Sequence, residues 1–305
     1  MQKKTDFRFE LLMDAGNGAQ KAGDILIQAF AKKGVYVFIE PIIPAEISPP
    51  KRTPFSLSGA VIRLSNSDIT NIGSFSNLVL VEHEILLERR FQDQEFNEGC
   101  TILLDLGSKK RAKDAYEAVE KKAIDAGYNL ITFSISEEAE SLIKSLNGNG
   151  KNMYYLGVLA RLFNVDNDFL KTFIKQTFKK LPADKLNSNI QIFDHGYNHD
   201  LVSKDDTIVF DGVVHKSEKV LLDGNTALSL GVIDAGIRLY AGYPITPASS
   251  IMHSLARLLP AYGGVLHQAE DEISAIGTVI GSYFAGVPAI TATSDPGCLK
   301  AASNV

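Results

Sequence analysis

Two short stretches decide the fold of the C-terminal part of this protein: residues 241–247, Ala-Gly-Tyr-Pro-Ile-Thr-Pro, and residues 268–277, Gln-Ala-Glu-Asp-Glu-Ile-Ser-Ala-Ile-Gly. The first stretch indicates a strand that ends at a proline turn, with the Thr246 hydroxyl exposed at its tip. The second places three consecutive carboxylates, at positions 270–272, before an otherwise uncharged helical segment. One carboxylate is sufficient for a helix cap that the dipole favours. The additional acids therefore mark this helix start as a candidate functional site.

Helices and strands alternate around these two stretches. The expected elements are a helix at 224–235, a strand ending at residue 241, a helix at 248–259, a strand at 265–268, a helix at 272–285 and a strand at 289–293. A helix that ends at glycine and precedes a short apolar strand is typical of a buried parallel sheet. Residues 273–294 are uncharged and long enough to span a bilayer, but three glycines and Pro288 interrupt them. We therefore expect a small α/β unit with three strands and no membrane span.

The first two hundred residues show the same alternation. Strands are expected at 7–13, 35–40, 59–64, 78–82, 101–106 and 129–135, with helices before Gly34, at 109–126 and up to about residue 180. Strands separated by helical stretches predict a mainly parallel α/β sheet. Residues 181–217 have few apolar pairs and predict a linker; the residues that suggest it are Pro182, Asn187, Asn189, Gly196 and Asn198. We therefore expect one domain over residues 1–200, a linker to about residue 217, and a second domain over residues 218–305.

A glycine-rich turn joins the first strand to the first helix, and it contains Gly16 and Gly18. Glycines at a helix N-terminus let the backbone approach an anion such as phosphate. The dinucleotide-binding fingerprint requires a third glycine at position 21, which is Lys21 here, although Glu40 after the next strand matches its ribose-binding acid. The turn is compatible with a nicotinamide cofactor, with another anion, or with a tight turn that binds no ligand.

Composition narrows the class of protein. The sequence has 305 residues, 45% of them hydrophobic and 22% charged, with a net charge of −5, which is typical of a globular protein that does not bind nucleic acid. Cys100 and Cys298 are the only cysteines, so they form neither a disulfide framework nor a four-thiolate site. No cluster of acids and histidines has metal-ligand spacing. We expect a cytoplasmic protein without a metal of its own.

The spacing of Glu272 and Gly281 resembles the glutamate-then-glycine helix of thiamine diphosphate enzymes. Together with Tyr243-Pro-Ile-Thr-Pro247, it resembles the 2-oxoacid:ferredoxin oxidoreductases whose gamma and alpha parts are fused, most closely over residues 221–297. The resemblance implies a Rossmann-like gamma domain followed by the first part of a thiamine diphosphate pyrimidine-binding α/β domain. It also implies oxidative decarboxylation of a 2-oxo acid to acyl-CoA, with coenzyme A as co-substrate and electrons passed to ferredoxin.

The resemblance also implies residue roles. Glu272 would protonate the aminopyrimidine ring, with Glu270 as second choice or as a helix cap, and Thr246 would contact the substrate carboxylate. The expected cofactor-binding residues are Tyr243, Pro244, Ile245, Glu270 and Gly281. In the gamma part, Gly16, Gly18 and Gln20 match a family turn, whereas Ala19 and Lys21 depart from it. Arg52 stands in a proline-rich loop and is a candidate contact for substrate or coenzyme A.

The sequence lacks a Gly-Asp-Gly motif for a magnesium-bound diphosphate and the thiolates for an iron–sulfur cluster. The resemblance implies that a beta subunit supplies both Mg²⁺ and the 4Fe-4S cluster and shares the thiamine diphosphate. Asp295 stands where the family has glycine, and the resemblance implies an alpha portion that is C-terminally incomplete. Three interpretations stay open: the fused gamma and partial alpha portion, a nicotinamide-dependent oxidoreductase, and a non-catalytic degenerate fragment.

Overall fold

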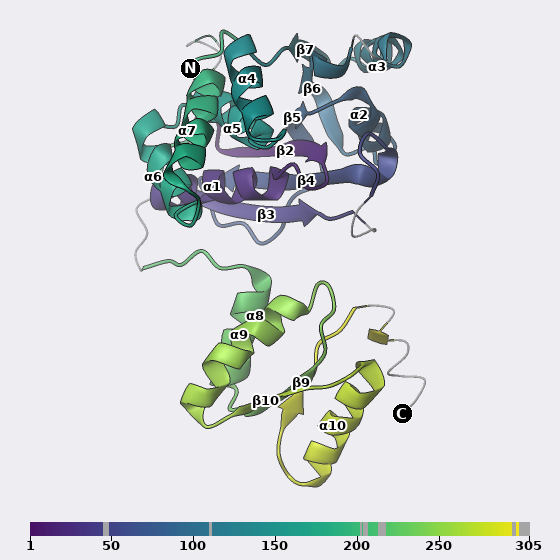
Figure 1. The fold of residues 1–305 in the computed structure, drawn as a ribbon, viewed down its shortest axis with the longest axis vertical. Helices are drawn as coiled ribbons and strands as arrows, with labels where there is room; N and C mark the ends of the chain where they lie inside the picture. Colours follow the sequence, from purple (N-terminus) through teal and green to yellow (C-terminus); the bar gives the residue numbers. More distant parts are fainter. Residues whose placement is uncertain are drawn as a thin grey trace. The chain divides into compact units, whose positions relative to one another are not determined.

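The computed structural model describes residues 1–44, 49–109, 112–201, 203, 207–212, 218–294 and 297–298. Asp295 lies outside these described residues. The protein divides into two compact units, Met1–Glu218 and Lys219–Val305. Each unit has its own sheet and its own buried core (Figure 1).

Unit 1 is built on a six-stranded sheet with the strand order β3-β4-β2-β5-β6-β7. The strands are β2 (Asp6–Asp14), β3 (Tyr36–Ile42), β4 (Leu57–Ser65), β5 (Ser76–Val81), β6 (Phe96–Asp105) and β7 (Asn129–Phe133). Strands β2, β5, β6 and β7 run parallel, which confirms the expected mainly parallel sheet, whereas β4 is antiparallel to both β2 and β3. Strand β4 follows β3 with no α-helix among the described residues between them, whereas parallel neighbours are usually joined through a helix.

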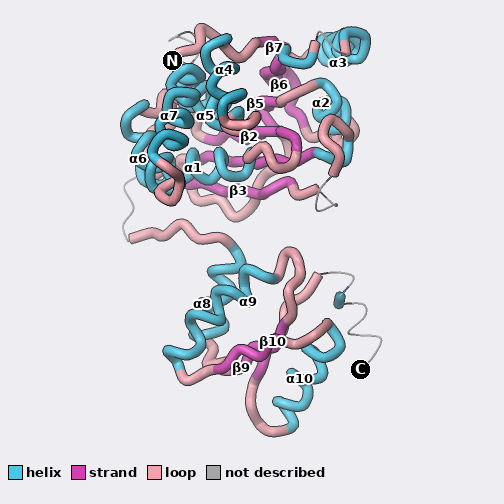
Figure 2. Tube along the Cα trace, in the orientation of Figure 1, coloured by secondary structure: helices cyan, strands magenta, loops and turns pink. Residues whose placement is uncertain are grey.

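Helices cover both faces of this sheet. They are α1 (Ala19–Lys32), α2 (Glu84–Phe91), α3 (Lys113–Asp125), α4 (Glu137–Ser145), α5 (Lys151–Leu162), α6 (Asn167–Thr177) and α7 (Ala183–Tyr197). Side chains of β5 alternate between two cores: Leu78 and Leu80 pack with α1, α5, α6 and α7, whereas Val79 and Val81 pack with α2 and α3. Figure 2 shows the strands in magenta with helices around them. Burial on both faces explains the continuous apolar run of β5 from Leu78 to Val81.

The expected linker at 181–217 is wrong over Ala183–Tyr197, because this stretch forms helix α7 and packs on α5. Its glycine is a contact residue: a Cβ on Gly196 would lie 2.0 Å from the carbonyl oxygen of Tyr154. Gly157 on α5 is equally close to the α7 backbone, with 2.3 Å from its would-be Cβ to the Phe193 oxygen. The glycine that suggested a linker therefore permits close helix packing. A two-stranded parallel sheet of β1 (Gln2–Lys3) and β8 (Ile208–Val209) completes unit 1.

Unit 2 has the alternation expected from its sequence. Its elements are α8 (Gly224–Asp234), β9 (Leu239–Gly242), α9 (Ser249–Leu258), β10 (Val265–Gln268), α10 (Glu272–Phe284) and β11 (Ala289–Ile290). The three strands are parallel, and β9 lies between β10 and β11. Tyr240 and Leu255 are fully buried in its core. Among the described residues, no helix has both the length and the apolar character that crossing a membrane requires.

Candidate functional site

The candidate residues of unit 2 gather at one edge of its sheet. Because β9, β10 and β11 are parallel, the segments that follow them leave from the same edge, where open α/β sheets bind ligands. Residues 243–246 follow β9, residues 269–272 follow β10, and residues 291–293 follow β11. The topology therefore brings together the two stretches that the sequence singled out.

Three side chains meet around one glycine at this edge. The Tyr243 hydroxyl and Thr293 Oγ1 are hydrogen-bonded at 2.7 Å. A Cβ on the buried Gly297 would lie 2.1 Å from Thr293 Oγ1, 2.7 Å from the Tyr243 hydroxyl and 3.1 Å from Glu272 Cγ. Glu272, Tyr243 and Thr293 are thus close neighbours, and only a residue without a side chain fits between them. The sequence patterns did not single out Thr293 or Gly297.

The three consecutive acids before α10 have different roles. Asp271 is the N-cap residue of α10, and its Oδ1 accepts a hydrogen bond from the Ser274 backbone N–H at 2.8 Å. The alternative assignment of the cap to Glu270 is therefore wrong, because Glu270 precedes the cap position and is exposed. Glu272 is the first helical residue and is partly buried. Because Asp271 caps the helix, Glu272 is not needed for that role.

The remaining predicted residues of unit 2 occupy different surroundings. Pro244 and Thr246 are exposed in the turn after β9, whereas Ile245 packs against the small cluster that contains Tyr243. Gly281 lies nine residues after Glu272 on α10, which places it about 13 Å along the helix axis and on the opposite side of the helix. Gly281 is exposed, and no atom lies within 4 Å of its would-be Cβ. Within unit 2, Gly281 is therefore apart from the Glu272 cluster.

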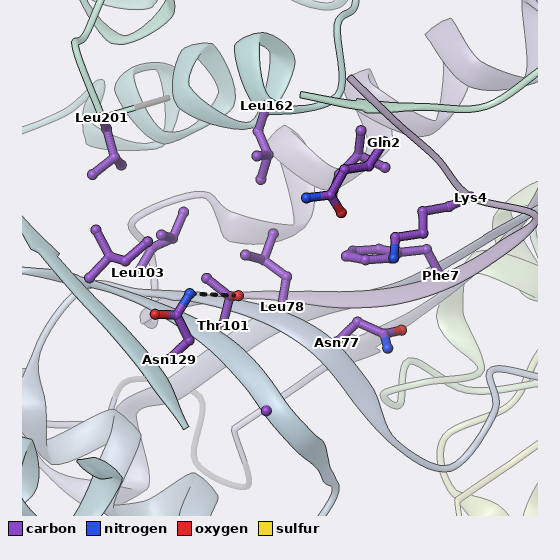
Figure 3. A pocket seen from close by; sticks show the side chains of 13 residues that line it. Gln2, Lys4, Phe7, Asn77, Leu78, Thr101, Leu103, Asn129, Leu162 and Leu201 are labelled. Carbon is purple, nitrogen blue, oxygen red and sulfur yellow. Dashed lines mark hydrogen bonds between the residues drawn. The ribbon is translucent and has the colours of Figure 1, made fainter. Parts of the chain in front are cut away.

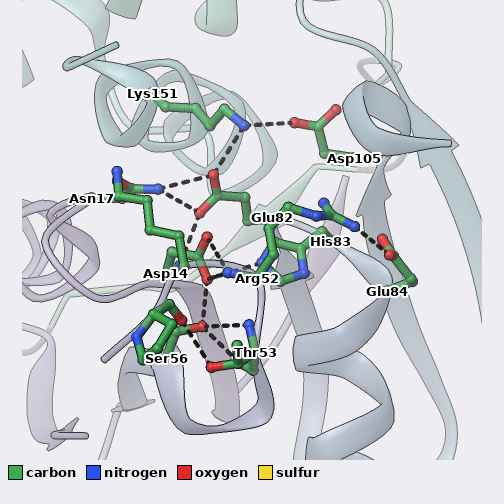
Figure 4. A network of polar contacts seen from close by, with 12 residues as sticks. Asp14, Asn17, Arg52, Thr53, Ser56, Glu82, His83, Glu84, Asp105 and Lys151 are labelled. Atoms are coloured by element: carbon green, nitrogen blue, oxygen red, sulfur yellow. Dashed lines mark hydrogen bonds and ion pairs between the residues drawn. The ribbon is translucent and has the colours of Figure 1, made fainter. Parts of the chain in front are cut away.

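Unit 1 carries a buried polar network at the corresponding edge of its sheet (Figure 4). Asp14 ends β2, Glu82 and His83 follow β5, and Asp105 ends β6. Each of these residues is at most 6% exposed. Lys151, the first residue of α5, lies over them, and its Nζ is 2.9 Å from Glu82 Oε1 and 3.8 Å from Asp105 Oδ2.

The network ties the glycine-rich turn and the proline-rich loop to the sheet. Glu82 Oε2 accepts hydrogen bonds from the Asp14 backbone N–H and from Asn17 Nδ2, both at 2.9 Å. Asp14 Oδ1 accepts from Ser56 Oγ at 2.6 Å and from the Arg52 backbone N–H at 3.1 Å. His83 Nε2 lies 3.0 Å from the same Asp14 oxygen. Two loops far apart in sequence are thus held by two neighbouring carboxylates, Glu82 and Asp14.

Burial and pairing shift the pKa values of this network in opposite directions. Burial raises the pKa of Asp105, and the nearby Lys151 ammonium only partly offsets this, so the pKa of this carboxyl lies above its usual value. Burial acts to lower the pKa of Lys151, but Glu82 and Asp105 outweigh it and the net shift is upward. For Asp14, burial acts to raise the pKa, but hydrogen bonds from His83 and Ser56 outweigh it and the pKa is lowered.

The predicted residues of unit 1 are packed within this framework. Gly18 has a φ of 87°, and a Cβ there would lie 2.5 Å from Asn152 Nδ2, whose amide donates to the Gly18 oxygen at 3.1 Å. Gly16 also has a positive φ, of 83°, and Gln20 Nε2 donates to the Ile42 oxygen at 3.4 Å. Packing therefore accounts for Gly18 without a ligand.

Arg52 is not simply a solvated loop residue, as an exposed arginine usually is. Its φ is 58°, its side chain is 33% exposed, and its guanidinium pairs with the buried carboxylate of Glu84. This pairing and the backbone bond to Asp14 fix the loop that carries Arg52.

The topology does not support the nicotinamide interpretation. The ribose-binding acid of that fingerprint ends the strand that follows the glycine turn, close to the turn. Here β4 separates β3 from β2, and the register pairs Glu40 with Val61 and Val61 with Glu10. Glu40 therefore lies two strand spacings away, about 10 Å, and level with the middle of β2.

In the part of the protein that the structure describes, the possible metal ligands are not grouped as a metal site and the two cysteines are unpaired. No three His, Cys, Asp or Glu residues are arranged there to hold a metal ion. Cys100 is buried and Cys298 is exposed, and neither forms a disulfide.

Both units match sequence profiles of known protein families. Residues 14–199 match the profile of the pyruvate ferredoxin/flavodoxin oxidoreductases, and residues 230–305 match the profile described as pyruvate flavodoxin/ferredoxin oxidoreductase, thiamine diphosphate-binding. Together with the two α/β units, these matches define an oxidoreductase subunit with a thiamine diphosphate-binding domain. The chain belongs to the pyruvate ferredoxin/flavodoxin oxidoreductase family.

Individual relatives agree with this assignment. The 2-oxoglutarate oxidoreductase subunit KorA of Mycobacterium tuberculosis is 26% identical over 93% of this chain and 46% of its own length. The 2-oxoglutarate synthase subunit KorA of Archaeoglobus fulgidus is 55% identical over 26% of this chain and 23% of its own length. The 2-oxoglutarate:ferredoxin oxidoreductase of Magnetococcus marinus, solved with 2-oxoglutarate, coenzyme A and succinyl-CoA bound, is 28% identical with a TM-score of 0.73 over 96% of this chain and 48% of its own. The chain thus spans about half the length of relatives that it matches from end to end.

Proposed function

We propose that this chain is the fused gamma and alpha portion of a 2-oxoacid:ferredoxin oxidoreductase, and that unit 2 supplies the pyrimidine-binding half of a thiamine diphosphate site. The observation that carries the proposal is the meeting of Glu272, Tyr243 and Thr293 around Gly297 at the carboxyl edge of the unit 2 sheet. The match of residues 230–305 to a thiamine diphosphate-binding domain supports the same edge as the cofactor site.

The residues at this edge suit the pyrimidine end of that cofactor. A ring with nitrogen acceptors and an amino group needs both acidic and hydroxyl partners, and Glu272, Tyr243 and Thr293 provide them within one cluster. The three groups pack directly against the backbone of Gly297, where any Cβ would clash with them. When bound, thiamine diphosphate supplies an electron sink for the decarboxylation of a 2-oxo acid. The protein residues need only position that group and exchange one proton with it.

We assign this proton exchange to Glu272. A carboxyl group in this role works best when it is removed from water and its pKa lies near neutrality. Glu272 is only partly buried within unit 2, so further protein must cover it in the assembled enzyme. Glu270 is exposed and is assigned to the outer surroundings of the cofactor together with Pro244, Ile245 and Gly281.

Thr246 is assigned to the substrate. It is exposed at the tip of the turn after β9, where an uncharged hydroxyl can contact a 2-oxo acid carboxylate. A hydroxyl holds this group without neutralising its charge, so the carboxylate can still leave as carbon dioxide.

We assign unit 1 to the gamma part of the oxidoreductase. Gly16, Gly18, Gln20 and Arg52 surround the carboxyl edge of its sheet, and Arg52 is the residue among these four with a partly exposed cationic head. A phosphate of coenzyme A is the ligand class that this group suits. Several relatives are named as subunits, and we propose that a beta subunit brings Mg²⁺, the diphosphate site and the 4Fe-4S cluster, with ferredoxin as the electron acceptor.

The test compares two neighbouring glutamates in the complete oxidoreductase that contains this chain. Glu272→Gln keeps the shape but removes the exchangeable proton, so the rate of 2-oxoglutarate-dependent methyl viologen reduction should fall by about a hundredfold to ten-thousandfold with little change in KM. Glu270→Gln removes an equal charge at an exposed position and should retain most of the rate. Loss with Glu270→Gln and none with Glu272→Gln would show that the active glutamate lies two positions earlier. Loss with neither would contradict the assignment of this edge.

A further inference from the structure

A cavity of about 440 Å³ lies in unit 1 at the opposite end of the sheet from the polar network (Figure 3). It is bounded by residues near the start of β2, β5 and β7 and by residues 99–103 of β6. Two residues of the β1 and β8 pair, Gln2 and Ile208, close one side. The volume lies within the range of about 300–1,000 Å³ that small-molecule sites occupy. This cavity is separate from the site proposed for thiamine diphosphate, which lies in unit 2.

Seven of the thirteen residues that line the cavity are apolar. Phe7 and Leu103 are buried side chains of the sheet, and Leu162 comes from the last turn of α5. Figure 3 shows Leu162 and Leu201 on one side of the space, with Leu78 and Leu103 across from them. An occupant therefore needs an apolar body.

Two polar residues of the sheet that line the cavity, Thr101 and Asn77, can each donate a further hydrogen bond. Asn129 Nδ2 donates to Thr101 Oγ1 at 3.3 Å, so the Thr101 hydroxyl hydrogen is available to another acceptor. Asn77 Oδ1 accepts from the Arg8 backbone N–H at 3.1 Å, which leaves the Asn77 amide hydrogens as donors. Both Thr101 and Asn77 line the cavity. The occupant therefore needs an acceptor group.

The charge of the lining points to an anion. Lys4 is the single charged residue among the thirteen that line the cavity, and no acid is among them. Lys4 is partly buried, and its ammonium forms no ion pair with any residue that the structure describes. Its neighbour Lys3 instead pairs with Asp211 at 3.1 Å. A carboxylate in the cavity would give Lys4 a partner.

We propose that this cavity binds a small organic monocarboxylate, with the carboxylate at Lys4 and the apolar body against Phe7, Leu103 and Leu162. The ligand would contact Gln2 and Ile208, and so hold β1 and β8 together. Binding should therefore reduce hydrogen exchange in these two strands.

Octanoate is the probe, because it combines one carboxylate with an apolar tail that fits the volume. Titration into the isotope-labelled protein, followed by amide chemical shifts, should give a Kd between about 0.1 and 1 mM. Lys4→Gln should weaken octanoate binding at least tenfold, and Lys4→Arg should retain it. Lys3→Gln is the matched control, since it removes the same charge one residue away outside the cavity lining, and it should leave the Kd unchanged.

Three results would overturn the proposal. The first is no shift of cavity residues with octanoate up to about 5 mM in the folded protein. The second is equal affinity for 1-octanol, which has the same apolar tail without the charge. The third is equal weakening by Lys3→Gln and Lys4→Gln, which would assign binding to general surface charge. Circular dichroism of each variant verifies that the comparison is made between folded proteins.

Discussion

Removal of the Lys151 ammonium should destabilise unit 1 strongly. Lys151 is the cation that faces two buried carboxylates: the Glu82 side chain, 7% exposed, at 2.9 Å and the Asp105 side chain, 1% exposed, at 3.8 Å. Breaking a buried ion pair by removing one partner typically costs about 3–5 kcal/mol. The Lys151 side chain is 27% exposed, so water can replace part of the interaction. For Lys151→Met we therefore expect a loss of about 2–4 kcal/mol in the free energy of unfolding.

This loss should depend on pH. Without Lys151, the pKa of Asp105 should rise beyond the elevation that burial already causes. Between the ordinary carboxyl pKa and this raised pKa, the folded variant binds more protons than the unfolded protein, so its stability falls as the pH rises through that interval. The deficit relative to the unmodified protein should be larger at about pH 8 than at about pH 5. An uncharged carboxyl at low pH needs no cationic partner.

Urea unfolding at both pH values, with hydrogen exchange of peptides from β2, β5 and α5, measures this loss in unit 1. The midpoint should move by about 1–2 M urea. Lys144→Met is the control, because Lys144 is 78% exposed and only 3.6 Å from Glu140 on the same helix, so its loss should cost under about 0.5 kcal/mol. Equal losses for the two variants, or equal deficits at both pH values, would refute the role given to Lys151.

Other positions give independent tests. Gly196→Ala should lower the urea midpoint of unit 1 clearly, since the new Cβ would lie 2.0 Å from the Tyr154 oxygen. Asp271→Ala should cost unit 2 about 1 kcal/mol in urea unfolding, because it removes the hydrogen bond to Ser274. Hydrogen exchange should show α10 opening at a lower free energy than α5. The reason is burial: Phe284 is 91% exposed and α10 buries only Ala275, whereas ten residues of α5 are buried. Equal protection of the two helices in a monomer would contradict this.

Local sequence patterns were sufficient to predict most helices and strands of the fold. Each element of unit 2 has its own start and stop signal, and β9, β10 and α10 begin or end within one residue of the sequence expectation. Tyr243 and Glu272, which the family resemblance singled out, lie at one edge because parallel strands deliver their following segments there. The misassigned linker at α7 had a physical cause: glycine usually breaks helices, but here its missing side chain is what allows α5 and α7 to touch.

The buried polar network of unit 1 could not be predicted from local sequence patterns. Lys151 and Glu82 are 69 residues apart in the sequence, and nothing in either segment specifies the other. A signal was nevertheless present, because β2, β5 and β6 are apolar runs that each end at an acid, Asp14, Glu82 and Asp105. Acids placed at the carboxyl ends of adjacent parallel strands must lie close together and need a shared cation. The position of that cation on α5 depends on how the helix packs, which the sequence does not state locally.

The two carboxyl edges differ in how deeply their polar groups are buried, and this difference supports the proposal that unit 2 is the place of chemistry. In unit 1, Asp14 and Glu82 each accept several hydrogen bonds from within the unit, so a ligand would have to displace existing partners. In unit 2, Thr246 is exposed and Glu272 is only partly buried, so both can be reached from outside the unit. A saturated buried network stiffens the loops that it holds, whereas a reachable acid beside hydroxyl groups can bind a partner molecule. We therefore propose that unit 1 positions a rigid surface carrying Arg52, and that the reacting groups belong to the edge that carries Glu272.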